Sequence, residues 1–142
     1  MSDYRRLRPR KYQVLVSQVY QTHIFPDSDI VHPFFILRSD GLLIVLAGYA
    51  WDGPSGPAPD SKWAMLASLF HDALYQMMRM GLLSRRFKPH ADWIYFEVLV
   101  RSGAPEHAAL LHHDAVRLFG GPATQPDPHE DAVFEFVALV PA

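Results

Sequence analysis

Residues 60–79 read DSKWAMLASLFHDALYQMMR and carry apolar side chains that recur every three or four positions. This spacing is that of one face of an α-helix. Asp60 or Ser61 can cap the first turn, and Gly81 is a residue suited to the turn that follows a helix. The pattern therefore predicts a helix that runs to about Arg79.

The sequence after this helix predicts two more. A polar stretch leads to Pro89, which suits the first turn of a helix that continues to about Arg101 and is ended by Gly103. Glu106 begins the next helix, which runs to about Phe119 and is followed by two glycines and a proline. The second half of the chain is therefore expected to be helical.

The sequence before residue 60 predicts strands. Apolar and polar residues alternate over Tyr12–Tyr20, and two apolar runs, residues 33–37 and 42–46, flank an Asp-Gly pair that favours a hairpin. We therefore expect an α+β fold and a single domain over residues 1–142. In it, a small antiparallel sheet from the first half packs on two or three helices from the second.

The amino-acid composition excludes several kinds of functional site. The chain has 142 residues, of which 49% are hydrophobic and 20% are charged, as in a typical globular domain. It has no cysteine, which excludes disulfides, zinc ribbons and thiolate catalysis. The formal net charge of -2 gives no clear signal for nucleic-acid binding.

The two ends of the chain differ from the middle. Residues 1–10 are basic and are expected to form a flexible arm, while residues 122–130 are expected to link the helices to a C-terminal strand or tail at Val133–Val140. No continuous apolar run follows the basic start, and the run Leu42–Ala50 is too short to span a bilayer. We therefore expect a cytoplasmic protein without a membrane segment.

The loop Asp52–Pro59 is the first candidate for function. It holds three prolines and two glycines, which neither a helix nor an inner strand accommodates. Asp52 and Ser55 lie on this rigid turn just after a strand, where they can orient a substrate. Alternatively, both side chains bond to the nearby backbone and only stabilise the turn.

The doublet His71-Asp72 is the second candidate. Tyr75 lies four residues after His71 and shares its helix face, whereas Asp72 points about 100° away. An imidazole and a carboxylate can together hold a divalent metal ion or act as a general base. The alternative is a buried His71 that bonds to a neighbouring carboxylate or carbonyl.

Asp92 is the third candidate. Its neighbours at the helical spacings of three and four, Tyr95 and Phe96, indicate that it faces inward, where a carboxylate needs a partner. His71, Arg85 or a cation could serve as that partner. The alternative is an aspartate in the first turn of a helix, where the helix dipole favours a negative charge.

These segments resemble a family of small bacteriophage and prophage proteins that has no assigned activity. That family shows an aromatic-Asp-Gly-x-Ser-x-Pro turn, a His-Asp-x-Leu-Tyr helix and an Ala-Asp-x-x-Phe block. The matching residues here are Trp51–Pro57, His71–Tyr75 and Ala91–Tyr95, although this chain has Tyr95 followed by Phe96 in place of a lone Phe. The resemblance implies a phage or prophage origin, in a host cell or a virion, and no particular reaction.

Two functions are left open by the sequence. The first is a non-enzymatic assembly or host-interaction module, which binds a phage or host protein and uses its Asp and His residues as a structural network. The second is a metal-assisted hydrolase, in which His71, Asp72 and Asp92 are catalytic and hold a divalent ion. The side chains that would bind its substrate are Asp52, Ser55, Tyr75 and Arg85.

Overall fold

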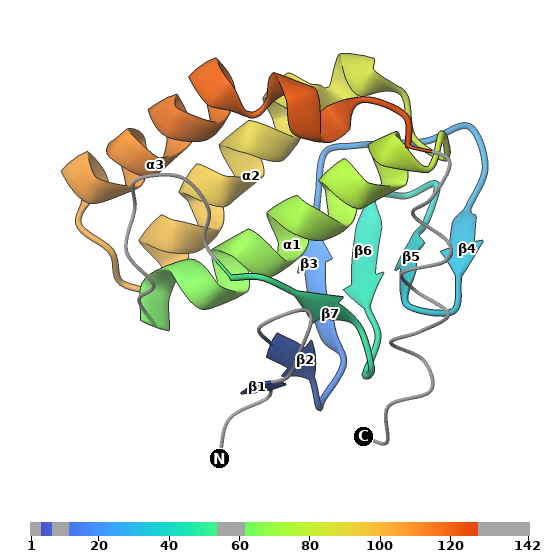
Figure 1. Ribbon diagram of the computed structural model, residues 1–142, viewed down its shortest axis with the longest axis horizontal. Coiled ribbons are helices and arrows are strands. Elements are labelled where there is room, and N and C mark those ends of the chain that lie inside the picture. The colour runs from blue at the N-terminus through green and yellow to red at the C-terminus, as the bar shows by residue number, and fades with distance from the viewer. Residues whose placement is uncertain (1–3, 7–11, 54–61, 128–142) are drawn as a thin grey trace. The chain divides into compact units, whose positions relative to one another are not determined.

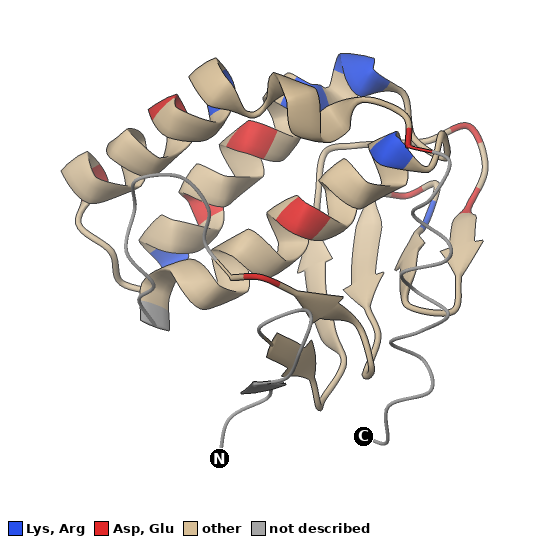
Figure 2. Ribbon diagram, in the orientation of Figure 1, with Lys and Arg blue, Asp and Glu red and all other residues tan. Residues whose placement is uncertain are grey.

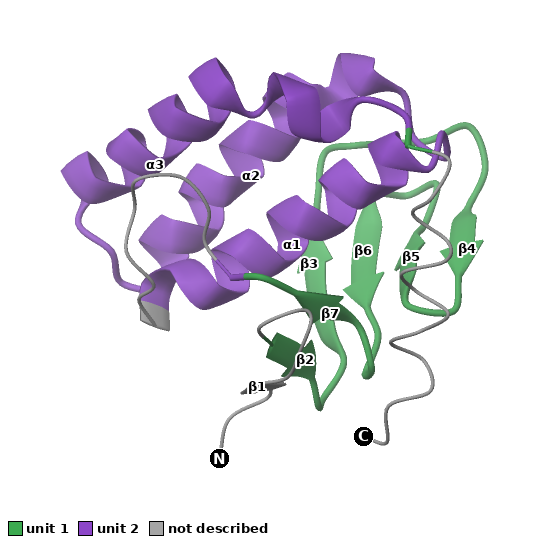
Figure 3. Ribbon diagram, viewed as in Figure 1, with its two compact units in different colours: residues 1–52, 127–142 green, residues 53–126 purple. Residues whose placement is uncertain are grey.

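The computed structural model describes residues 4–6, 12–53 and 62–127. The strands come first in the chain and the helices follow, as Figure 1 shows, which confirms the predicted α+β class. The chain divides into two compact units, coloured separately in Figure 3. We call Gly53–Pro126 the helical unit and the remainder, which includes all the strands, the strand unit.

The strand unit contains two antiparallel sheets in its described part. One has the strand order β1-β2-β7 and the other the order β3-β6-β5-β4. The strands are β1 (Tyr4–Arg6), β2 (Tyr12–Val14), β3 (Gln18–Gln21), β4 (Ile30–His32), β5 (Phe35–Leu37), β6 (Leu42–Val45) and β7 (Ala50–Trp51).

The predicted hairpin is present. β5 pairs antiparallel with β6, and Gly41 in the turn between them has a φ of 90°, a conformation that glycine adopts without strain. A Cβ at Gly41 would also lie 2.6 Å from the carbonyl oxygen of Thr22. Side chains of both strands, such as Leu37 and Leu43, are fully buried and form part of the core.

One segment of the strand unit differs from expectation. The alternating stretch Tyr12–Tyr20 forms two strands in different sheets, because the chain bends where Ser17 Oγ accepts a hydrogen bond from the Ala47 amide at 3.0 Å. Tyr4–Arg6 pairs with β2, and the flexibility of the basic arm, residues 1–10, stays a prediction. Backbone pairing of this kind is not visible in a pattern of charged residues.

The helical unit contains the three predicted helices. They are α1 (Lys62–Arg79), α2 (Lys88–Arg101) and α3 (Glu106–Phe119). The short 3₁₀ helix η1 (Arg85–Phe87) lies between α1 and α2, and a second one, η2 (Gly121–Thr124), follows α3. α1 packs against α2 and η2, and α2 packs against α3. Gly81 and Gly103 have φ values of 74° and 104°. This conformation cannot continue a helix, which explains why α1 and α2 end shortly before these glycines, as predicted.

α1 is buried almost all round. Among its described side chains, only Trp63, Leu66, Asp72 and Arg79 are partly exposed. A helix of this kind normally carries few polar groups, because a buried polar atom without a partner destabilises the fold. Any hydrogen-bond partner of the buried His71 ring must therefore come from inside the protein.

The segment 122–130, expected to be a linker, starts as part of the packed structure. Arg79 Nη1 donates to the Ala123 carbonyl at 2.8 Å, and Arg85 Nε donates to Thr124 Oγ1 at 3.1 Å. Thr124 itself is fully buried. The predicted strand or tail at Val133–Val140 lies outside the described residues. No helix in the described part of the chain is both long and apolar enough to cross a membrane.

Candidate functional site

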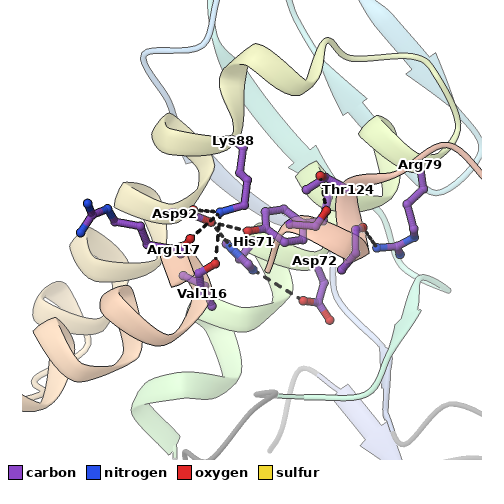
Figure 4. A network of polar contacts seen from close by, with 11 residues as sticks. His71, Asp72, Arg79, Lys88, Asp92, Val116, Arg117 and Thr124 are labelled. Carbon is purple, nitrogen blue, oxygen red and sulfur yellow. Dashed lines mark hydrogen bonds and ion pairs between the residues drawn. The ribbon is translucent and has the colours of Figure 1, made fainter. Parts of the chain in front are cut away.

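Asp92 accepts hydrogen bonds from three side chains in the interior of the helical unit (Figure 4). His71 Nε2 and Tyr75 Oη, both on α1, lie 2.9 Å and 2.5 Å from Asp92 Oδ1. Lys88, one turn earlier on α2, donates from Nζ to Asp92 Oδ2 at 2.7 Å. Asp92 is 1% exposed, so these partners take the place of water. We call these four residues the Asp92 network.

Lys88 connects the Asp92 network to α3. Its Nζ also donates to the carbonyl oxygens of Val116 and Arg117, each at 3.2 Å, in the last turn of α3 (Figure 4). The Val116 carbonyl also accepts a hydrogen bond from the Gly120 amide at 2.8 Å. The last carbonyls of a helix have spare acceptor capacity, and the helix dipole makes this end attractive to a cation. One ammonium group thereby uses its three donors to join α2 to the end of α3.

His71 lies between two carboxylates. Its ring is 2% exposed, with Nε2 bonded to Asp92 and Nδ1 at 3.8 Å from Asp72 Oδ1. The second distance is too long for a hydrogen bond, so Nδ1 has no hydrogen-bond partner among the described residues. Asp72, whose side chain is 28% exposed, therefore acts on the ring through its charge.

The pKa shifts of His71 and Asp92 favour the charged form of each group. Burial by itself lowers the pKa of His71, but Asp72 and Asp92 outweigh this effect and raise it above its ordinary value. Burial raises the pKa of Asp92, and its bonds with His71, Lys88 and Tyr75 reverse that shift, so that its pKa is lowered. Both shifts favour an ion pair between His71 and Asp92, while Lys88 binds the second carboxylate oxygen of Asp92.

Aromatic rings enclose the imidazole. The ring of Tyr75 lies 4.0 Å from that of His71 between centroids, and the ring of Tyr95 meets it edge-on at 5.0 Å. Tyr95 is in turn stacked with His112 of α3 at 5.5 Å. Burial raises the pKa of the Tyr75 hydroxyl, and the neighbouring Asp92 raises it further, so this hydroxyl stays protonated and acts as a donor.

The structure brings together only part of the predicted site. His71, Tyr75 and Asp92 are in direct contact, and Asp72 lies beside them. Arg85 does not contact Asp92; it is exposed and bonds to Thr124. Asp52 is exposed at the end of the strand unit, and Ser55 lies outside the described residues.

Lys88 is the residue that sequence reasoning missed. It occupies the position proposed for Arg85 or a cation beside Asp92. The signal was present, because Lys88 and Asp92 are four residues apart, a spacing at which opposite charges meet on one helix face. Placing Pro89 at the start of α2 left Lys88 outside the predicted helix.

The predicted metal site finds no support in the described part of the chain. There, no group of three His, Asp or Glu side chains is arranged to hold a metal ion. The physical reason is that Asp72 and Asp92 approach opposite nitrogens of the His71 ring and do not converge on one point. The Lys88 ammonium already supplies the positive charge beside Asp92.

Comparison of the chain with known proteins adds no further assignment. No protein-family model, curated protein or solved structure matches it. The functional argument therefore depends on the residues and contacts described above.

Proposed function

We propose that this protein is a non-enzymatic assembly or host-interaction module of phage or prophage origin, in which the Asp92 network is structural. The observation that carries the proposal is the closure of that network. Both oxygens of a carboxylate that is 1% exposed are bonded to side chains of the same chain. A general base must come within hydrogen-bond reach of a substrate, and aromatic rings enclose the His71 imidazole.

The network holds three helices in one arrangement. His71 and Tyr75 contribute from α1, Asp92 and Lys88 from α2, and the bonds of Lys88 reach the last turn of α3. A buried charge without its partner is costly, so shifting any one helix would leave an unpaired charge inside the protein. Such a network keeps the three helices in a fixed arrangement. A fixed arrangement suits a protein that acts by binding partners at its surface.

An exposed apolar surface supports a role in assembly. Leu111, Leu118 and Phe119 of α3 are 69%, 66% and 76% exposed. Clustered apolar side chains on a protein surface typically mark a binding surface, because their contact with water is unfavourable. The metal-assisted hydrolase is the weaker alternative, since a metal ion between His71 and Asp92 would lie on the same carboxylate as the Lys88 ammonium and be repelled by it.

Urea unfolding of two variants, with and without a chelator, tests the proposal. His71→Ala leaves Asp92 short of a partner and should lower the free energy of unfolding by about 3–5 kcal/mol. Leu74→Ala, which removes a fully buried side chain of the same helix, should lower it by about 2–5 kcal/mol. His90→Ala, an exposed position on α2, is the control and should change it little.

A structural network predicts comparable losses for His71→Ala and Leu74→Ala, with no effect of the chelator. The hydrolase alternative predicts that His71→Ala changes the free energy of unfolding of the metal-free protein little, because a metal ligand that faces a cleft does not hold the helices together. That second result, together with stabilisation of the unmodified protein by a divalent ion, would overturn the proposal.

A further inference from the structure

We infer that α3 is a strap over the Asp92 network, and that it opens while α1 and α2 stay packed together. This inference goes beyond the proposed function, because it concerns how water reaches the interior of the helical unit. Three observations support it: the weak attachment of α3, the position of its last turn over the network, and the anchoring of the chain on either side.

α3 is attached to the rest of the helical unit by few apolar contacts. Of its 14 residues, only Ala109 and Val116 are buried, and both have small side chains. α2, which also has 14 residues, buries six of them. Two ring contacts add to the attachment, those of His112 with Tyr95 and of His113 with Trp93. Because apolar burial is the main force that holds helices together, α3 is held less tightly than α1 and α2 hold each other.

Polar contacts strengthen this attachment little. Among the described residues, the only hydrogen bonds between α3 and the other two helices are those from Lys88 to the carbonyls of Val116 and Arg117. α3 carries both acidic and basic side chains, as Figure 2 shows. Even so, no ion pair joins α3 to α1 or α2 in the described part of the chain.

The end of α3 covers the outer side of the Asp92 network. Lys88 Nζ lies 3.2 Å from each of two carbonyl oxygens in the last turn of α3 (Figure 4). Gly120 lies so near Tyr75 that a Cβ on this glycine would be 2.5 Å from Tyr75 Oη. Lys88 and Tyr75 donate to different oxygens of Asp92. Opening of α3 therefore admits water to both sides of this carboxylate.

Opening of α3 leaves the charges of the network paired. Lys88 and Asp92 are both on α2, and His71 bonds to Asp92 from α1, so none of these bonds depends on α3. Lys88 exchanges two carbonyl acceptors for water, which hydrates an ammonium group strongly. A small shift of α3 that excluded water would leave donors of Lys88 unsatisfied, whereas full opening does not.

The chain is anchored on both sides of α3. α2 precedes it, and after it Thr124 of η2 is fully buried and accepts a hydrogen bond from Arg85. Gly103, with a φ of 104°, lies between α2 and α3, and Gly120 and Gly121 lie where α3 meets η2. Glycine gives the backbone conformations that other residues rarely adopt. α3 can therefore move between two fixed ends, as a strap does.

Native-state hydrogen exchange of the full chain tests the opening. We expect the amides of α3 to exchange through an opening that requires less free energy, and depends less on urea, than the opening that exposes the amides of α1. Val116→Ala, which truncates the larger buried side chain of α3, should speed exchange in α3 by about tenfold or more.

The matched variant is Leu74→Ala. Leu74 is fully buried in α1, which packs against α2 and η2. Since the α1–α2 packing persists when the strap opens, Leu74→Ala should speed exchange of the slowest amides of α1 and leave exchange in α3 unchanged. Circular dichroism shows that each variant is folded. The urea dependence is measured on the unmodified protein and requires no variant.

Acetylation of lysine tests whether the strap covers the network. Lys88 reacts only when Nζ is released from its three acceptors, and mass spectrometry separates its rate from those of Lys11 and Lys62, the other two lysines of the chain. We expect Val116→Ala to raise the rate at Lys88 by the same factor as exchange in α3. Leu74→Ala should leave this rate unchanged, and Lys11 and Lys62 serve as references for the reagent.

Two results would overturn the inference. If α3 and α1 exchange through one common opening, with the same urea dependence, α3 does not open separately. If Val116→Ala speeds exchange in α3 but leaves the acetylation of Lys88 unchanged, α3 does not control access to the Asp92 network.

Discussion

The charges around Asp92 balance within one small volume. When His71 is protonated, it and Lys88 supply two positive charges, and Asp92 and Asp72 supply two negative ones. Removing ions from water is costly, and mutual attraction offsets that cost only where hydrogen bonds also satisfy the groups. Asp92 meets this condition with three hydrogen-bond donors. Asp72 remains partly in contact with water and therefore requires fewer donors from the protein.

The raised pKa of His71 predicts a pH-dependent stability. A histidine whose pKa is higher in the folded than in the unfolded state stabilises the fold while it is protonated. Its contribution is fully present below the ordinary value of 6.5 and is lost as the pH rises through the folded pKa. The charged groups that face His71 are Asp72 on α1 and Asp92 on α2, with Lys88 on the far side of Asp92.

The measurement is the difference in free energy of unfolding between the unmodified protein and His71→Gln, taken between about pH 6 and pH 9. We expect this difference to shrink as the pH rises. Burial lowers the pKa of His112, which produces the opposite trend, but this histidine is present in both proteins and cancels. A difference that is constant over this range would mean that His71 is neutral in the folded protein.

At the scale of single elements, the end of α3 depends on a glycine. Gly120 caps the helix with a φ of -80°, which any residue can adopt. A Cβ there would nevertheless lie 2.4 Å from the Val116 carbonyl oxygen and 2.5 Å from the Tyr75 hydroxyl. The first group accepts a hydrogen bond from Lys88, and the second donates one to Asp92. Gly120 therefore allows α3 to end against the Asp92 network.

We expect Gly120→Ala to destabilise the protein by about 1–3 kcal/mol, the usual cost of overpacking an interior site. The matched control is Gly121→Ala, because a Cβ at Gly121 meets nothing within 4 Å. Thermal unfolding of both variants provides the measurement. Equal melting temperatures for the two variants would contradict the close contact at Gly120.

The elements differ in how well their sequence predicts them. α1, α2 and α3 were predicted within about two residues, because glycines and prolines mark their ends and their apolar spacing is regular. The stretch Tyr12–Tyr20 was predicted as one strand, since alternation reveals side-chain faces and not the sheet to which a strand belongs. The Ser17 hydrogen bond that accompanies its bend depends on Ala47, thirty residues later.

At the scale of the whole molecule, stability should be unevenly distributed. α1 is buried almost all round, while α3 exposes a full face to solvent. Amides in the middle of α1 should therefore exchange with solvent only through large openings, and amides on the outer face of α3 through smaller ones. Hydrogen exchange, measured at a concentration where the chain is monomeric, should show slower exchange in α1. Equal protection of the two helices would contradict this gradient.

Only part of the candidate site could be predicted from the sequence, and the reason is physical. His71, Tyr75 and Asp92 carry polar atoms on helix faces that are otherwise apolar, so a shared partner could be anticipated. The bonds from Lys88 to the carbonyls of Val116 and Arg117 could not be predicted in this way. Any helix end offers such carbonyls, and only the packing of α3 on α2 selects these two. The contribution of Asp52 and Ser55 to a site stays a prediction.

The buried bond between His71 and Asp92 offers a spectroscopic reporter. Nε2 of His71 lies 2.9 Å from Oδ1 of Asp92, and a proton on this nitrogen is screened from water by the surrounding side chains. Ring protons of solvent-exposed histidines exchange with water too quickly to be observed, whereas this one can leave only when the helices separate. Among the eight histidines of the chain, His71 could therefore give a resolved imidazole NH signal in solution. Its intensity would follow the closing and opening of the interior around Asp92 directly.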